Sequence, residues 1–198
     1  MLVNLKINSS SIKKNLEKKV EIKILGTSDV HGRILPWNYA ADEENNSGSY
    51  AQISTYVKKV RENNKNVLFM EVGDAIQDNW IEYFANDKNH PIPQILNYMK
   101  CDIFVPGNHE FNFGMPTLTN ILKKMKAKKL LANLFYNDEN KNNFNLCKDK
   151  KRYLDAATII EKDGVKIGVI GVSTPMTKKF EEDTGFLKNF HFVSVIAE

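Results

Sequence analysis

The sequence has few cysteines, few arginines and no long apolar run. Only Cys101 and Cys147 are cysteines among its 198 residues, too few for a disulfide-stapled scaffold. Its 28 basic residues include only three Arg, the side chain that reads guanine edges and forks onto phosphates, and the net charge is only +4. No apolar run approaches the roughly 18 residues that a membrane-spanning helix needs. These absences argue against a nucleic-acid polymer and against a membrane as partners.

The first 20 residues differ from the rest of the chain. They are polar, punctuated by lysines, and lack the apolar run of about 7–15 residues of a signal peptide. We therefore expect residues 1–20 to be an N-terminal extension and the chain to be cytoplasmic. The whole chain is 42% hydrophobic and 26% charged, which is typical of globular proteins and leaves residues 21–198 as one domain.

Short apolar runs alternate with amphipathic stripes along the chain. The runs predict four strands, at 22–28, 67–72, 102–105 and 129–135. The stripes predict three helices, over 50–63, from Pro91 to Met99 and from Pro116 to Met125. Asp163-Gly164 between two apolar arms predicts a β-hairpin, because both positions tolerate a positive φ. Strands that alternate with helices indicate an α/β fold with a layered sheet.

Three polar motifs each follow a predicted strand. They are Asp29-Val30-His31, Gly73-Asp74 and Gly107-Asn108-His109-Glu110. The first two motifs alone are typical of ordinary loops, and Gly-Asn-His-Glu is more unusual. Open α/β sheets place their ligands where strands end, and all three motifs lie there. Their carboxylate, imidazole and amide donors suit Mn²⁺, Zn²⁺ or Fe, and the lack of a cysteine ligand argues against a closed structural zinc site.

Longer strings around these motifs resemble a known family. They are TSDVHGRI, SYAQISTYVKKVR, EVGDAIQ, GNHEFNFG and IGVIGVSTP. Together they resemble the calcineurin-like metallophosphoesterase superfamily and, more closely, the bacterial 5′-nucleotidase and 2′,3′-cyclic-nucleotide phosphodiesterase family, over residues 21–198. The resemblance implies an αββα sandwich of which the chain holds the N-terminal portion, with the remaining ligands and a C-terminal substrate-binding domain absent. Relatives of this kind are often exported.

The resemblance also implies roles for particular residues. Asp29 and His31 would ligate a first metal, Asp74 would bridge two metals, and Asn108 would ligate the second. His109 resembles the catalytic histidine that stabilises the phosphoryl transition state or protonates the leaving oxygen. The cofactors would be two divalent ions, Mn²⁺, Zn²⁺, Mg²⁺ or Fe, which supply a metal-bound hydroxide at neutral pH.

Asn112 departs from part of this family. In the 5′-nucleotidase branch the residue three after the catalytic histidine is an aspartate that orients it, whereas Asn112 resembles the cyclic-phosphodiesterase branch. We therefore expect hydrolysis of a small-molecule nucleotide phosphoester, with the cyclic diester favoured over the 5′-monoester. The only later histidine, His191, lies in a strand-like run, so the family's downstream ligands have no counterpart here. A truncated, non-catalytic fragment or binding module therefore remains the alternative, and the oligomeric state stays open.

Other residues have more ordinary interpretations. Cys101 is expected in the core rather than as a nucleophile, because no neighbouring base is evident. Trp80, Tyr83 and Phe84, at near-helical spacing, are expected in the core rather than in a base-stacking platform. Glu110 is left open between a partner of the metal ligands and a helix-start or surface carboxylate.

Overall fold

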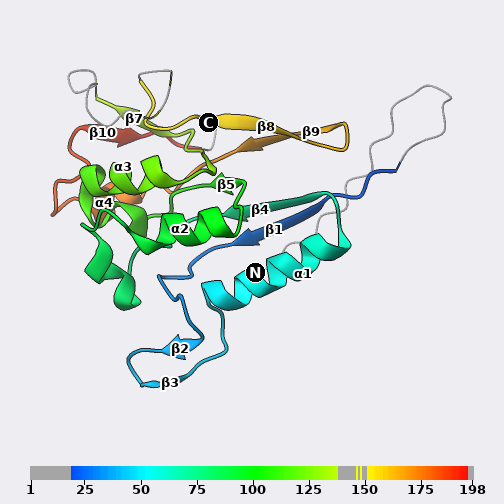
Figure 1. The fold of residues 1–198 in the computed structure, drawn as a ribbon. Helices are drawn as coiled ribbons and strands as arrows, with labels where there is room; N and C mark the ends of the chain where they lie inside the picture. The colour runs from blue at the N-terminus through cyan, green and yellow to red at the C-terminus, as the bar shows by residue number, and fades with distance from the viewer. Residues whose placement is uncertain (1–18, 138–145, 147, 149–150, 196–198) are drawn as a thin grey trace.

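The computed structural model describes residues 19–137, 146, 148 and 151–195 (Figure 1). The strands are β1 Lys23–Thr27, β2 Trp37–Asn38, β3 Glu43–Glu44, β4 Val67–Glu71, β5 Ile103–Phe104, β6 Lys128–Lys129, β7 Leu134–Tyr136, β8 Ala157–Lys162, β9 Val165–Ile170 and β10 Phe190–Phe192. The helices are α1 Tyr50–Asn63, α2 Pro91–Tyr98, α3 Gly114–Lys124 and α4 Thr177–Phe180, with 3₁₀ helices at Asn79–Phe84 and His109–Phe111. Residues 1–18 of the expected extension, and Cys147, lie outside the described residues.

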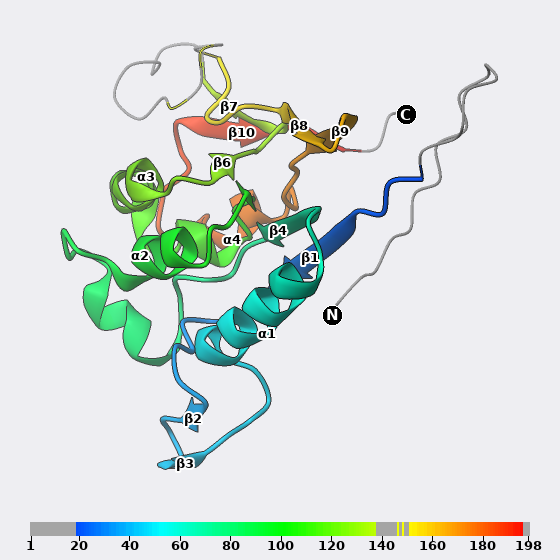
Figure 2. The same cartoon turned by 45° about the vertical axis from the view of Figure 1, so that its right-hand side comes forward.

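A parallel sheet organises the molecule. Its strands follow the order β1-β4-β5-β6, so their carboxyl ends meet at one edge. Helices α1, α2 and α3 lie along one face of this sheet (Figures 1 and 2). There Phe69 and Phe104 are fully buried against Val57, Leu96 and Leu118 of the three helices. Burial of each such side chain contributes roughly 1.5–3 kcal/mol to the stability of the fold. Apolar packing against the sheet therefore holds the three helices in place.

The opposite face of the sheet packs on the β8–β9 hairpin. Leu68 and Ile103 form a second buried cluster there, against Ile160 of β8 and Val169 of β9. The other side of the hairpin faces outward, with Ile159 exposed by 70%. Helix layer, parallel sheet and hairpin are the helix–sheet–sheet part of the expected αββα sandwich, and the α/β class is confirmed.

Local signals account for most element boundaries. Helix α1 spans 50–63 as predicted, and the Ser49 hydroxyl caps it by accepting the Gln52 N–H at 3.3 Å. The β8–β9 turn is the predicted Asp163-Gly164 pair, with φ of 50° and 82°. None of the helices in the described ranges is long and apolar enough to cross a membrane.

One predicted strand was wrong in extent. Residues 129–135 divide into the end of β6 and the start of β7, which belong to different sheets. The N–H of Leu130 still donates to the Phe104 carbonyl of β5. Beyond it the chain leaves the parallel sheet, because Leu131 donates to the Asp155 carbonyl and Ala132 to the Gly171 carbonyl. Strand β7 then pairs with β10, which contains His191 and so lies in the strand-like run expected there.

Candidate metal centre

The turns after β1 and β4 are joined by backbone hydrogen bonds. The N–H of Asp29 donates to the Gly73 carbonyl at 3.0 Å, and the N–H of His31 donates to the Asp74 carbonyl at 2.9 Å. These bonds continue the β1–β4 pairing beyond the ends of the strands. The two predicted motifs therefore lie side by side, as expected for neighbouring parallel strands.

Three of the candidate residues have a left-handed backbone. Asp29, His31 and Asp74 have φ of 56°, 48° and 57°. This region is sparsely populated by residues other than glycine and costs of order 1–3 kcal/mol each. Such conformations cluster where the surrounding structure holds side chains for function, and all three lie at the same sheet edge.

The turns after β4 and β5 touch through two glycines. A Cβ on Gly73 would lie 2.1 Å from the Gly107 nitrogen, and one on Gly107 would lie 2.3 Å from Asp74 Oδ1. Gly73 also has a φ of +101°, which side chains rarely adopt. Only glycine at both positions allows the second and third motifs to approach this closely.

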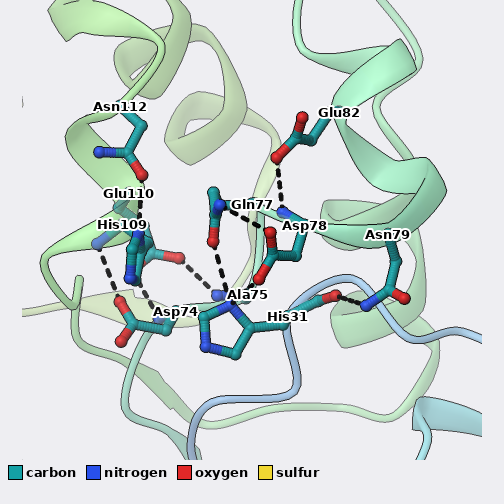
Figure 3. A network of polar contacts seen from close by, with 10 residues as sticks. All are labelled: His31, Asp74, Ala75, Gln77, Asp78, Asn79, Glu82, His109, Glu110 and Asn112. Atoms are coloured by element: carbon teal, nitrogen blue, oxygen red, sulfur yellow. Dashed lines mark hydrogen bonds and ion pairs between the residues drawn. The ribbon is translucent and has the colours of Figure 1, made fainter. Parts of the chain in front are cut away.

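The side chain of Glu110 holds the turns after β4 and β5 together. Its fully buried carboxylate accepts the backbone N–H groups of Asp74 and Ala75, both at 2.7 Å (Figure 3). It also accepts the N–H of Gly107 at 2.6 Å. Burial raises the pKa of Glu110, while the three N–H donors act in the opposite direction. The structure thus decides a question that the sequence left open: Glu110 is an internal clamp rather than a surface residue.

The clamp brings three donor side chains together. His31, Asp74 and His109 offer ligand atoms that all lie within 4.8 Å of one another, and Figure 3 shows them side by side. Asp74 is nearly buried, at 9% exposure, and its Oδ1 accepts the His109 N–H at 2.9 Å. One carboxylate and two imidazoles form a donor set that fits Zn²⁺, Mn²⁺ or Fe. We call these three side chains the donor group.

Partners orient the His31 ring within the donor group. Its Nδ1 lies 3.1 Å from Gln77 Oε1 and 3.4 Å from Asp78 Oδ2, so this nitrogen donates. The remaining nitrogen, Nε2, keeps its lone pair for a cation. A metal-ligating histidine typically makes such a second hydrogen bond through its other ring nitrogen. Gln77 ends the string EVGDAIQ and Asp78 follows it, but no local pattern marks either as a partner of His31.

Comparison with known proteins decides the family. Residues 22–189 match the family model described as calcineurin-like phosphoesterase. The chain belongs to the calcineurin-like phosphoesterase family. Among curated relatives, the trifunctional nucleotide phosphoesterase protein YfkN of Bacillus subtilis is 30% identical over 182 residues, which are 83% of this chain and 12% of that protein. The 2′,3′-cyclic-nucleotide 2′-phosphodiesterase/3′-nucleotidase of Salmonella typhimurium is 27% identical over 79% of this chain and 25% of that protein.

Solved structures agree on the fold of this phosphoesterase chain. The crystal structure of YfkN from Bacillus subtilis matches with a TM-score of 0.70 and 25% identity, over 87% of this chain and 54% of that one. The 5′-nucleotidase precursor of Thermus thermophilus matches with a TM-score of 0.66 and 22% identity, over 87% of this chain and 32% of that one. The chain therefore spans about half or less of the proteins it resembles.

The phosphoesterase fold places the predicted site residues unevenly. His31 and Asp74 lie in the donor group, and His109, expected to be catalytic, lies there as well. Asp29 is exposed and its carboxylate is outside the donor group, although its backbone is held at the same edge. Asn108 is half-buried and directly precedes the 3₁₀ helix that carries His109. The ring of His109 reaches Asn112, with Nδ1 and Oδ1 2.7 Å apart.

The expectation that Trp80, Tyr83 and Phe84 lie in the phosphoesterase core was wrong. Trp80 and Tyr83 are 60% and 84% exposed and Phe84 is 37% exposed, whereas Ile81 is buried. The segment is a 3₁₀ helix, in which residues three apart share a face. Trp80 and Tyr83 therefore face outward together, while Phe84 lies on the side of the buried Ile81, at the end of the helix. The Cys101 prediction was correct: the thiol is buried, and burial raises its pKa to about 12.

The exposed aromatic residues border a cavity next to the donor group. Trp80 lies between Tyr39 and Tyr83, with ring centroids 6.0 and 5.9 Å apart. These three rings line the same cavity, of about 1160 Å³, as Asp29 and His31. This volume slightly exceeds the roughly 300–1,000 Å³ of typical small-molecule sites, so a small molecule fits with room to spare.

Proposed function

We propose that this chain is the metal-binding part of an enzyme that hydrolyses nucleotide phosphoesters. One observation carries the proposal: a carboxylate and two imidazoles lie within 4.8 Å of one another at the carboxyl edge of a phosphoesterase sheet. The names of relatives support the substrate class, because they describe nucleotide phosphoesterases and 2′,3′-cyclic-nucleotide phosphodiesterases. The donor group fits divalent cations through its nitrogen and carboxylate oxygen donors.

Asp29, His31, Asp74 and Asn108 would hold the two divalent ions. When bound, such cations polarise phosphoryl oxygens and lower the pKa of water. His31 would bind through Nε2, because Gln77 and Asp78 occupy Nδ1. Asp74 would offer the oxygen that the His109 N–H leaves free. The exposed Asp29 carboxylate would have to turn inward to join them.

His109 would act on the phosphoryl group or the leaving oxygen. Its Nδ1 is occupied by Asn112, and its Nε2 is the remaining polar atom of the ring. When Nε2 also carries a hydrogen, the ring can donate a hydrogen bond or a proton from there to an oxygen of the ester. Asn112 rather than aspartate supports the cyclic diester as the preferred substrate. The cavity beside the donor group, with its aromatic rim, supports a substrate of nucleotide size.

The test is hydrolysis by the natural protein that carries this chain. We expect Mn²⁺-dependent release of product from 2′,3′-cyclic AMP, with a higher kcat/KM than for 5′-AMP. Asp74→Asn and His109→Gln should each lower turnover at least a hundredfold. Glu62→Gln, which removes an exposed carboxylate in α1, serves as the control. A tenfold preference for 5′-AMP would refute the cyclic diester, and no hydrolysis of any nucleotide would favour the non-catalytic binding module.

A further inference from the structure

A chain of hydrogen bonds leads from His109 to a buried carboxylate that no motif marks. Asn112 Oδ1 lies 2.7 Å from His109 Nδ1, and Asn112 Nδ2 donates to Glu181 Oε1 at 2.5 Å. The other oxygen of Glu181 accepts the Thr184 hydroxyl at 2.9 Å. Glu181 is only 3% exposed and directly follows α4, 69 residues after Asn112. Two segments distant in the sequence therefore meet at this amide.

The direction of each hydrogen bond follows from the chemistry of its groups. An ionised carboxylate can only accept, so Glu181 must face the NH₂ of Asn112 and not its carbonyl. The amide oxygen of Asn112 is then turned toward His109. An amide oxygen also only accepts, so the hydrogen must sit on Nδ1 of a neutral His109 ring. Nε2 is left with its lone pair.

We propose that Glu181 is a positioning residue that sets the tautomer and orientation of His109 through Asn112. The inference deepens the proposed function, on which it rests for the role of His109. An asparagine alone cannot set the tautomer, because its amide can present either oxygen or NH₂ to the ring after a half-turn. Glu181 removes this ambiguity by accepting from one end of the amide. The negative charge of Glu181 is separated from the His109 ring by the Asn112 amide, whereas an aspartate at position 112 would place its charge directly beside the ring.

The position of Glu181 fits this role. Oε1 accepts from Asn112, and Oε2 accepts from the Thr184 hydroxyl, whose single hydrogen is shared with the Glu181 backbone carbonyl. Thr184 therefore ties the carboxylate to the turn after α4. The backbone N–H of Glu181 donates to the Thr177 carbonyl at 3.1 Å. The carboxylate is therefore held from its own segment while it holds the Asn112 amide. Its neighbour Glu182 is exposed and offers a matched control in the same turn.

The proposal predicts a specific pattern across four combinations at two positions. In the wild type, the Glu181 carboxylate faces the Asn112 amide and fixes which end of that amide points to His109. Glu181→Gln leaves two amides, either of which can turn. Asn112→Asp leaves two carboxylates face to face, which repel. The double variant Asn112→Asp/Glu181→Gln again pairs one carboxylate with one amide, and the introduced carboxylate would accept directly from His109 Nδ1.

The experiment is ¹⁵N NMR of the histidine rings in the metal-free 198-residue chain, at a pH where the rings are neutral. The His109 signals are identified by their loss in His109→Gln. We expect the wild type to be at least about 90% in the Nδ1–H form, Glu181→Gln to show both tautomers, the double variant to regain Nδ1–H, and Glu182→Gln to match the wild type. A wild-type ring in the Nε2–H form overturns the proposal without any variant, and so does an unchanged ring in folded Glu181→Gln.

This readout is independent of catalysis. If the tautomer follows the expected pattern while the natural protein hydrolyses no phosphoester, Glu181 keeps its positioning role and the proposed function fails. If the natural protein hydrolyses nucleotides but the His109 tautomer is unchanged in Glu181→Gln, the proposed function stands and the positioning role of Glu181 fails. In an active protein, Glu181→Gln should lower kcat about tenfold with KM changed less than twofold, and the double variant should recover most of the loss.

Discussion

The donor group has two sides that are held in different ways. On the side of β4 and β5, the turns of Asp74 and His109 are clamped by the buried Glu110 and by the contact of two glycines. On the side of β1, His31 is half-exposed and oriented by Gln77 and Asp78, and the Asp29 carboxylate lies outside the donor group. One half is preorganised by the fold, whereas the other is open to adjustment when a ligand binds.

This difference suggests a division of labour. The rigid half holds Asp74 and His109 in fixed positions, and preorganised groups lose little entropy when a ligand binds. The open half borders the cavity, so its side chains can settle around cation and substrate together. Substitutions on the rigid side should therefore cost stability as well as binding, and substitutions on the β1 side should affect binding alone.

The largest effect is expected at the clamp itself. Glu110→Gln replaces a carboxylate oxygen by an NH₂ that faces backbone donors, and leaves buried N–H groups without an acceptor. We expect the free energy of unfolding to fall by about 3–5 kcal/mol, measured by urea denaturation. Glu44→Gln, at an exposed position in β3, should change it by less than about 0.5 kcal/mol. A loss at Glu110 as small as at Glu44 would mean that the clamp does not hold the rigid side.

A second buried carboxylate joins the two sides beneath the turns. Glu71 at the end of β4 accepts the Thr27 hydroxyl of β1 at 2.7 Å, and burial raises its pKa from 4.5 to about 8. The folded protein therefore binds this proton more tightly than the unfolded chain does. The resulting stabilisation is complete below about pH 4.5 and is lost as pH rises through about 8.

The test is the difference in unfolding free energy between the wild type and Glu71→Gln from pH 5 to pH 9. We expect the wild type to lose about 4 kcal/mol relative to the variant over this range, because Gln has no proton to lose. Other titrating groups cancel in the difference. A difference that stays constant with pH would show that Glu71 is ionised in the folded protein throughout.

The fold and the site were predictable to different degrees. Helix α1 and the β8–β9 turn depend on neighbouring residues, such as the Ser49 cap and Asp163-Gly164, and the sequence predicts both. The clamp depends on N–H donors 35 and 36 residues before Glu110, and the Asn112–Glu181 contact spans 69 residues. Only the folded sheet brings such partners together, so no local pattern marks them.

A smaller loss of stability is expected from the glycine contact. Gly73→Ala would place a Cβ against the Gly107 backbone and impose a side chain on a φ of +101°. We expect a cost of about 1–3 kcal/mol and weaker Mn²⁺ binding, because the second and third motifs must move apart. Gly168→Ala in β9 is the matched control, since its Cβ would meet nothing within 4 Å. Equal losses of unfolding free energy in the two variants would show that the Gly73–Gly107 contact does not stabilise the rigid side.

The smallest effect distinguishes the two sides directly, through the Mn²⁺ affinity of the 198-residue chain measured by calorimetry. Asp74→Asn removes the central carboxylate of the donor group and should weaken binding at least about tenfold. Asp29→Asn should weaken it about threefold or less, because its exposed carboxylate must give up water and turn inward before it contributes. Asp183→Asn, with the same change of charge at an exposed position, should have no effect. If Asp29→Asn is as damaging as Asp74→Asn while stability is unchanged, the β1 side is as much a part of the bound centre as the clamped side, and cation binding itself completes the site.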